Sequence, residues 1–461
     1  MTPHSTAPTV RPLRARMLRS GAWLVGSNLG SQVLRLASNL VLTRLLLPQD
    51  FGLMAAVNTL YFALVMFSDL GVWQSVVKSP HGDDPRFLGT AWSMQMARAG
   101  LLALGVLGMV LGLLLGQGAG VFAPDTVYAD SRLPWMMSVF ALCALLQGGE
   151  SMRLATAQRQ LHGRVMARLE LSSQLAALFV TLGLAWWTQT VWALLAGTLI
   201  GSAMRTLLSH LVVPGTPVRP CWDRSHVREL LGFGKWILLS SVVGFLAAHG
   251  EKLILGATLG LATFGVFAIA GNLLAAAMGV YSTINGRVIF PSLSQALRDD
   301  DETGLVRVYT RVQQIADGFL GLLTGMLLMA GQWVVWLLYD ARYHEAGWML
   351  QWLSLGLLAM RHQVVEQLMF ARGMPAWVTT NNILRAVLLA TAVPAGYTLA
   401  GERGAIAGVV LSQFASWPLS LYFKYRQGLL HWGTERWWLP ALLVGMAGGS
   451  IVHLLLSAWH A

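Results

Sequence analysis

The chain of 461 residues has 55% hydrophobic and only 11% charged residues, whereas soluble domains carry about 25% charged residues. This composition excludes a soluble globular protein, and the mean hydropathy of +0.57 leaves room for about a dozen membrane spans of roughly 20 residues each. The net charge of +11 is interpreted as a record of membrane topology, so no nucleic-acid partner is predicted.

Apolar segments follow one another along the whole chain. The start is basic but lacks a small-residue cleavage site, so the first segment is predicted to stay as a span. We expect an all-α polytopic membrane protein with about twelve to fourteen transmembrane helices. The thirteen predicted spans are 21–42, 52–77, 87–115, 133–154, 169–187, 191–213, 234–257, 264–290, 312–338, 347–370, 378–399, 404–423 and 437–456.

The distribution of Lys and Arg sets the orientation, because basic residues in short loops stay on the cytoplasmic side. Of 32 basic residues, 24 fall in the N-terminal tail and the even-numbered loops, and four fall inside spans. The odd-numbered loops hold Arg44, Arg132, Arg342 and Arg403. The N-terminus is therefore predicted to be cytoplasmic, while the side of the C-terminus stays open.

An internal repeat appears when the sequence is shifted by 213 residues. The shift places Trp23 over Trp236, residues 40–42 over 253–255, and Phe51-Gly52 over Phe264-Gly265. Six spans separate the copies, so both point the same way and two pseudo-symmetric bundles should face each other around a central cleft. The predicted division is an N-terminal lobe (1–213), a basic cytoplasmic linker (214–231), a C-terminal lobe (232–426) and an extra span (427–461).

Glycines at helical spacing are predicted to allow close helix packing. They are Gly108, Gly112 and Gly116, and the pairs Gly197/Gly201, Gly321/Gly325 and Gly404/Gly408.

Polar residues form a stripe on the first span, which therefore should not face lipid. The stripe consists of Asn28, Ser31, Gln32, Arg35, Ser38 and Asn39. The repeat-related seventh span carries Lys252 one turn beyond the position that matches Arg35. We predict that Arg35 and Lys252, with Asn28, Gln32 and Asn39, line the cleft and bind an anionic phosphate or pyrophosphate. The alternative is internal ion pairing, with Asp69 or Glu150 as the partner carboxylate.

Carboxylates inside spans are candidates for ion coupling, since burial raises their affinity for a proton. These candidates are Asp69, Glu251, Asp317 and Glu366. Asp69 has the alternative of a structural cap or ion pair. Arg98 and Arg385 are as readily explained by snorkelling or pairing as by substrate binding.

Several chemistries leave no trace in the sequence. There is no phosphate-binding loop, no His-Glu-x-x-His motif and no cysteine pair, and Cys143 and Cys221 are interpreted as packing residues. No cofactor, metal or catalytic residue is predicted, so the protein is expected to be a transporter rather than an enzyme.

The run Leu45-Leu46-Leu47-Pro48-Gln49-Asp50-Phe51-Gly52, followed by Phe67-Ser68-Asp69-Leu70-Gly71, resembles the first two spans of Wzx-type polysaccharide flippases. These belong to the multidrug/oligosaccharidyl-lipid/polysaccharide exporter superfamily. Such flippases have twelve or fourteen spans, so thirteen departs from the pattern. Phe51, Gly52, Asp69 and Gly71 are interpreted as folding landmarks rather than ligands.

The resemblance implies a bacterial inner-membrane flippase. Its substrate would be an undecaprenyl-pyrophosphate-linked oligosaccharide for O-antigen, capsule or exopolysaccharide assembly, and a polymerase with its chain-length machinery would be further partners. An ion-coupled multidrug or cation exporter is an alternative, but it predicts an acidic cleft. A non-transporting envelope-assembly scaffold is another, and it predicts that every intramembrane charge is paired.

Overall fold

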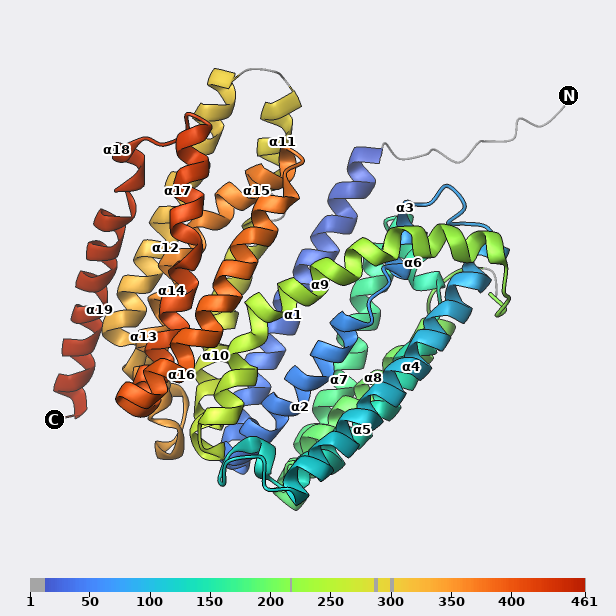
Figure 1. Ribbon diagram of the computed structural model, residues 1–461, viewed down its shortest axis with the longest axis horizontal. Coiled ribbons are helices and arrows are strands. Elements are labelled where there is room, and N and C mark those ends of the chain that lie inside the picture. Colours follow the sequence, from blue (N-terminus) through green and yellow to red (C-terminus); the bar gives the residue numbers. More distant parts are fainter. Residues whose placement is uncertain (1–12, 216–217, 286–288, 299–301, 461) are drawn as a thin grey trace, which may run out of the picture.

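The computed structural model describes residues 13–215, 218–285, 289–298 and 302–460, and Figure 1 shows them as a bundle of long helices. Within these ranges no strand is formed. The first half, called the N-lobe, contains α1 (Leu13–Leu45), α2 (Pro48–Phe67), α3 (Val72–Lys78), α4 (Pro85–Gly118), α5 (Arg132–Gly148), α6 (Arg153–Arg159), α7 (Gly163–Thr188) and α8 (Trp192–Leu211). The second half, called the C-lobe, contains α9 (Arg224–Thr258), α10 (Leu261–Ile284), α11 (Phe290–Arg298), α12 (Glu302–Leu338), α13 (Ala346–Ser354), α14 (Gly356–Ala359), α15 (Gln363–Ala371), α16 (Pro375–Gln413), α17 (Trp417–Arg426), α18 (Trp432–Glu435) and α19 (Trp438–His460).

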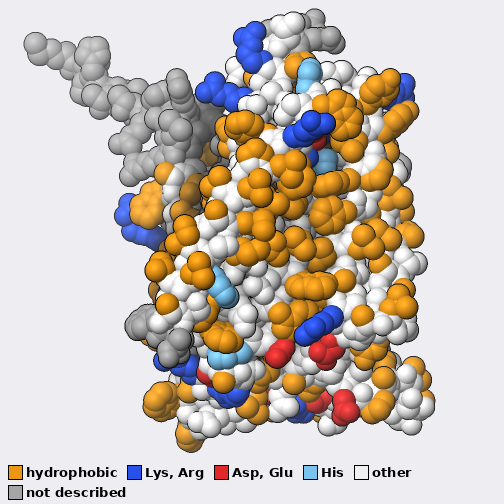
Figure 2. All heavy atoms as spheres, turned by 90° about the vertical axis from the view of Figure 1, so that its left-hand side faces the viewer, with side chains coloured by type: hydrophobic (Ala, Val, Ile, Leu, Met, Phe, Trp, Pro, Cys, Tyr) orange, Lys and Arg blue, Asp and Glu red, His pale blue; other side chains and the backbone are white. Residues whose placement is uncertain are grey.

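Within the described residues, the thirteen predicted spans fall mostly on helices, and residues 286–288 of the span 264–290 lie outside the described ranges. In the described part of the chain, eight helices are long and apolar enough to cross a membrane by length and composition. Figure 2 shows one face of the molecule covered by hydrophobic side chains, with charged side chains gathered toward its two ends. These features confirm an all-α polytopic membrane protein.

The predicted boundaries are wrong where a span contains a break. The span 52–77 is divided into α2 and α3 by a turn at Gly71, whose φ is +62°. The span 133–154 is divided between α5 and α6, and the span 347–370 contains α13, α14 and α15 in succession. The predicted boundary between the spans 378–399 and 404–423 is confirmed, because α16 contains non-helical residues at Ala400 and Gly401. Glycine permits the left-handed backbone at Gly71 and Gly401, which the hydropathy pattern does not reveal.

The predicted linker is largely ordered against the N-lobe. α9 begins at Arg224 and runs along the end of the molecule that carries the even-numbered loops (Figure 1). The fully buried Leu230 joins a hydrophobic cluster with Phe87 and Val76. Ser79 donates a hydrogen bond to Glu229 over 2.7 Å. The side chain of Trp236, which the repeat pairs with Trp23, lies outside the described residues.

The internal repeat appears in how the helices pack. α2 begins at Pro48 and α10 at Leu261, 213 residues later, and the two helices pack on each other. Likewise α1 packs on α7 as α9 packs on α16. A Cβ atom added to Gly52 would lie 2.6 Å from the Leu261 carbonyl oxygen and 3.1 Å from the Gly265 nitrogen, and one added to Gly265 would overlap the Pro48 carbonyl. Repeat-related glycines therefore meet at the contact between the lobes.

The odd-numbered loops lie at one end of the molecule, which we call the odd-loop end. Two of these loops reach across to the opposite lobe, and we call this reciprocal contact the clasp. From the N-lobe, Tyr128 donates a hydrogen bond to the Leu253 carbonyl over 3.1 Å. From the C-lobe, Tyr343 donates to the Leu46 carbonyl over 2.9 Å, and Arg342 donates to the Thr43 carbonyl over 2.9 Å. Hydrogen bonds from Arg342 lower the pKa of Asp340. The same hydrogen bonds orient the Arg342 guanidinium. The lobes are thus tied together at the odd-loop end.

The run of residues 45–52, on which the family resemblance rests, lies in the same region. Asp50 accepts a hydrogen bond from the Leu47 backbone nitrogen over 3.1 Å and lies 3.5 Å from Arg132. Phe51 packs edge-on against Tyr343, with ring centroids 5.9 Å apart. Asp50 therefore caps α2, and Phe51 packs against a tyrosine of the clasp. The contact of Phe51 fits its interpretation as a folding landmark.

Glycine packing is confirmed for some predicted positions and not for others. Cβ atoms at Gly321 and Gly325 would collide with the backbone of α19, and one at Gly404 would collide with Gly396. The contacts of Gly321 and Gly325 fasten α19 onto α12. The thirteenth predicted span therefore packs with the C-lobe and ends at the odd-loop end (Figure 1). The prediction was wrong for Gly108 and Gly112, around which a Cβ atom would meet nothing within 4 Å.

The contact between repeat-related glycines predicts that Gly265→Ala destabilises the protein. The added methyl group forces α2 and α10 apart, and overpacking costs about 1–3 kcal/mol. The thermal unfolding midpoint of the detergent-purified protein should fall, whereas Gly108→Ala, placed in open space, should leave it unchanged or raise it. Equal midpoints for the two variants would contradict the close packing.

Candidate functional site

The predicted polar stripe on α1 is divided between two directions. Ser31 is buried, and its carbonyl accepts a hydrogen bond from Gln174 of α7 over 3.1 Å. Gln32 instead lies against α10, because a Cβ atom at Gly279 would be 2.8 Å from its amide nitrogen. Gln32 therefore faces the other lobe, while the backbone of Ser31 contacts α7.

Arg35 is exposed on α1, as is Asn28, whereas Asn39 is half-buried. Among the residues that the structure describes, no hydrogen bond or ion pair involves the Arg35 side chain. Neither predicted partner is available to it: Asp69 lies 4.0 Å from Arg98, and Glu150 binds Arg205 over 2.9 Å. A cation at this depth therefore stays accessible, since internal pairing does not neutralise it.

Lys252 lies in a cavity of about 250 Å³ within the C-lobe, which we call the C-lobe cavity. Its polar lining consists of His249, Glu251, Lys252, Asn272, Arg385 and Gln413. The ring of His249 packs edge-on against Phe62 of the N-lobe, with ring centroids 5.2 Å apart. The structure thus separates Lys252 from Arg35, which does not line this cavity, but connects the cavity to the lobe interface through His249.

A smaller cavity of about 50 Å³ adjoins the first, and Arg385 and Gln413 line both. It contains Glu366, His362 and Asn381. Both ring nitrogens of His362, both amide atoms of Asn381 and the Nε atom of Arg385 are buried without a hydrogen-bond partner. Buried polar groups are normally satisfied, so these atoms mark a place for water, a proton or a small ion.

Two predicted coupling residues, Glu251 and Glu366, therefore lie on either side of Arg385. Sequence reasoning left Arg385 undecided between snorkelling and binding. Its position inside a span was the available signal, because a charge there is costly unless it serves a pathway or a pair.

The third coupling candidate, Asp317, belongs to a buried ionic network. Arg361 binds Asp317 through two hydrogen bonds of 2.8 and 2.6 Å and binds Glu435 over 3.0 Å. Glu435 also pairs with Lys424 over 2.6 Å, and Gln313 donates to Asp317 over 2.7 Å. Each of these four charged residues is at most 7% exposed. The network ties α12, α17 and α18 together, and Asp317 is paired within it.

Asp69, the fourth candidate, stabilises a turn and lines a different pocket. Its carboxylate accepts a hydrogen bond from the Gly71 backbone nitrogen over 2.9 Å. Arg98, which faces it, donates to the Val65 carbonyl over 2.8 Å. This agrees with the structural alternative for Asp69.

Metal chemistry has no centre in the described part of the chain, where no three His, Cys, Asp or Glu residues gather in a way that could hold an ion. Cys143 is buried and Cys221 is half-buried, and both are free thiols.

Solved structures of known membrane proteins have a similar fold. One solved structure, an inward-facing multidrug resistance MATE family transporter of the MOP superfamily, aligns with a TM-score of 0.68 at 14% identity, covering 86% of this chain and 94% of that one. The lipid II flippase MurJ in an inward closed conformation aligns with a TM-score of 0.66 at 9% identity, covering 94% and 92%. The chain therefore has the two-lobed, all-helical fold of these membrane proteins.

Sequence comparison then identifies the family. The model of the polysaccharide biosynthesis protein family matches residues 41–347. The lipopolysaccharide biosynthesis protein WzxC of Escherichia coli (strain K12) is 24% identical over 456 residues, covering 95% of this chain and 89% of that protein. The chain belongs to the polysaccharide biosynthesis protein family.

The ionic network predicts that Asp317→Asn destabilises the protein strongly. Removing one partner of a buried ion pair leaves an uncompensated charge and costs about 3–5 kcal/mol. The unfolding midpoint should fall well below that of Glu366→Gln, a matched change in a carboxylate without an ion pair within 4 Å among the described residues. If Asp317→Asn kept the wild-type midpoint but abolished transport, Asp317 would be a coupling residue after all.

Proposed function

We propose that this protein flips an undecaprenyl-pyrophosphate-linked oligosaccharide across the bacterial inner membrane for polysaccharide assembly. The accessible, unpaired Arg35 on α1 is the observation that carries the proposal. An exposed guanidinium at membrane depth needs an anionic partner, and a diphosphate suits its paired N–H donors. The family membership supplies the polysaccharide context, and the relative named WzxC agrees with it.

In this proposal the N-terminus and the even-numbered loops face the cytoplasm. The clasp and the Gly52–Gly265 contact then close the periplasmic side, so that the described conformation faces inward. Release outside requires both clasp loops to detach and the lobes to rock apart about the axis at α2 and α10. The head group crosses in the space between the lobes while the polyprenyl chain remains in lipid.

Two sources of energy fit this arrangement. A membrane potential that is positive outside drives the substrate's negative charge outward with about 2.3 kcal/mol per charge per 100 mV. The C-lobe offers a second route, since Glu251 and Glu366 form a chain of carboxylates beside Arg385 that are able to take up a proton. His249 places one end of this chain against Phe62 of the N-lobe, where a change of charge would alter lobe contact.

A flippase of this kind hands its product to enzymes at the outer face. We therefore expect the polymerase and chain-length machinery to be its functional partners, with the lipid-linked oligosaccharide as the shared molecule.

The role of Arg35 is tested by flipping of lipid-linked oligosaccharide in proteoliposomes. Arg35→Ala should slow flipping about 10- to 100-fold, because a hydrogen bond to a charged group is worth about 1.5–3 kcal/mol. Lys252→Ala should slow it as well, and Arg35→Lys should retain part of the activity. Arg44→Ala, an exposed arginine in the last turn of the same helix, is the control. If wild type moved a cationic dye but no lipid-linked glycan, the exporter alternative would replace this proposal.

Coupling through the C-lobe predicts a separate phenotype for Glu251→Gln and Glu366→Gln. Each variant should lose the acceleration that a pH gradient gives to wild type while still responding to an electrical potential. Glu402→Gln, an exposed carboxylate at the kink of α16, should behave as wild type. A gradient response that survives both neutral substitutions would assign the drive to the potential alone.

A further inference from the structure

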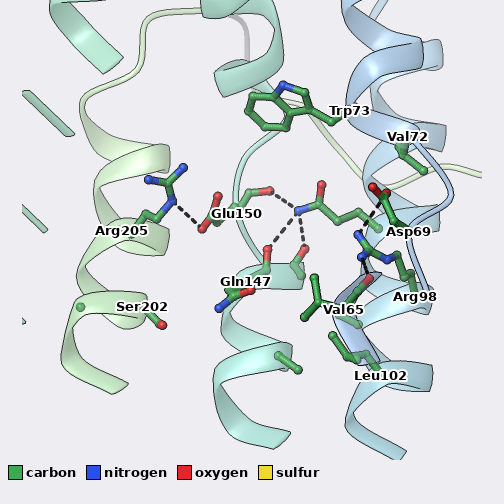
Figure 3. A pocket seen from close by; sticks show the side chains of 15 residues that line it. Val65, Asp69, Val72, Trp73, Arg98, Leu102, Gln147, Glu150, Ser202 and Arg205 are labelled. Carbon is green, nitrogen blue, oxygen red and sulfur yellow. Dashed lines mark hydrogen bonds and ion pairs between the residues drawn. The ribbon is translucent and has the colours of Figure 1, made fainter. Parts of the chain in front are cut away.

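A second large pocket lies inside the N-lobe, away from Arg35 and the C-lobe cavity, and we call it the N-lobe pocket. Its volume is about 470 Å³, which is in the range of small-molecule sites. Figure 3 shows the pocket between the helices that carry Arg98, Gln147 and Arg205, with Trp73 at one edge. The pocket could not be predicted from the sequence, since its lining comes from α2, α3, α4, α5, α8 and the turns that follow α2 and α5.

The charges that line the pocket cancel one another. Asp69 faces Arg98 at 4.0 Å, and Glu150 binds Arg205 over 2.9 Å, as Figure 3 shows. The side chains of Arg98 and Arg205 are still 24% and 34% exposed. Each guanidinium is therefore reachable but already neutralised, so a pyrophosphate would meet a carboxylate beside every arginine. The lining disfavours a highly charged anion and offers fixed donors and acceptors to an uncharged polar molecule.

Two glutamines add unused hydrogen-bonding atoms. Gln95 donates through its amide nitrogen to the carbonyls of Gln147 and Gly148, over 3.1 and 3.3 Å. The Gln147 amide oxygen accepts a hydrogen bond from Tyr61 over 3.2 Å. Within the described ranges, the remaining amide oxygen of Gln95 and amide nitrogen of Gln147 have no partner. One acceptor and one donor are thus held in place by bonds made through the other end of each amide.

An aromatic face completes the lining. The indole nitrogen of Trp73 donates to Gln158 over 2.6 Å, which fixes the orientation of the ring. Small and apolar residues lie between the polar groups, among them Ala99, Ala144 and Gly201. A pyranose ring matches such a lining, because its hydroxyl groups both donate and accept while its C–H face packs against an aromatic ring.

We propose that the N-lobe pocket is a subsite for uncharged sugar units of the transported head group, distinct from the place where Arg35 holds the diphosphate. This inference rests on the proposed flippase function. It assigns Trp73 to sugar stacking and Gln95, Gln147 and the two ion pairs to hydroxyl recognition. Two separate places on the N-lobe then recognise different parts of one amphiphile.

Binding to the purified full-length protein tests the subsite. The probe is the oligosaccharide repeat unit released from its lipid carrier by mild acid hydrolysis, with undecaprenyl phosphate and inorganic pyrophosphate as comparison ligands. Trp73→Ala and Gln147→Glu should each raise the Kd for the oligosaccharide at least 10-fold. Gln147→Glu keeps the acceptor for Tyr61, so its fold is preserved while the donor is lost. Undecaprenyl phosphate should bind all variants within twofold.

Trp187→Ala removes a tryptophan that is 83% exposed on α7 and serves as the matched control. Oligosaccharide binding within twofold of wild type in both pocket variants would overturn the subsite, as would competition by pyrophosphate at this pocket. Flipping measured with the same proteins distinguishes failure of the subsite from failure of the proposed flippase function. If wild type flips the lipid-linked oligosaccharide and Trp73→Ala flips and binds it equally well, only the subsite fails. If wild type neither flips nor binds it, the proposed function fails.

Discussion

The close backbone contact between α2 and α10 is the constraint on which the rest of the architecture depends. Gly52 and Gly265 occupy the same position in the two copies of the repeat, and neither can carry a side chain without displacing the opposite helix. A contact between equivalent positions of the two copies lies on the pseudo-twofold axis that relates them. The clasp tyrosines, Tyr128 and Tyr343, add hydrogen bonds between the lobes at the same end of the molecule.

Inside each lobe, the arrangement of charge follows from the absence of water in the bilayer. The C-lobe neutralises Asp317, Arg361, Glu435 and Lys424 in a network whose members are at most 7% exposed. Such a network contributes little net stability against an apolar equivalent, but its disruption is costly. It therefore fixes one geometry for α12, α17 and α18, next to the cavities that Arg385 lines.

The sequence predicts the architecture well, because hydropathy, the positions of basic residues and the repeat each report long stretches of chain. It predicts the site only in part. Arg35 could be recognised as an intramembrane charge, but its lack of a partner depends on Asp69 and Glu150 finding Arg98 and Arg205 instead. Asp317 resembled Glu366 in sequence, yet its partner Arg361 is 44 residues away. Glycine spacing failed at Gly108 for the same reason, since it does not say whether a neighbouring helix is present.

The two lobes share a scaffold but not a chemistry, and this difference argues for a division of work. At the repeat offset, Lys252 corresponds to Asn39, Arg385 to Ser172 and Asp69 to Ser282. The N-lobe thus keeps carboxylates and guanidiniums in balanced pairs around a roomy pocket, which suits an uncharged polar ligand. The C-lobe pairs Asp317, Arg361, Glu435 and Lys424 in its network and places Glu251 and Glu366 beside Arg385 in its two cavities. In the proposed function, these two carboxylates suit a proton. A pseudo-symmetric carrier needs equivalent helices to rock, whereas substrate and drive have different chemistry and are best held on opposite sides of the axis.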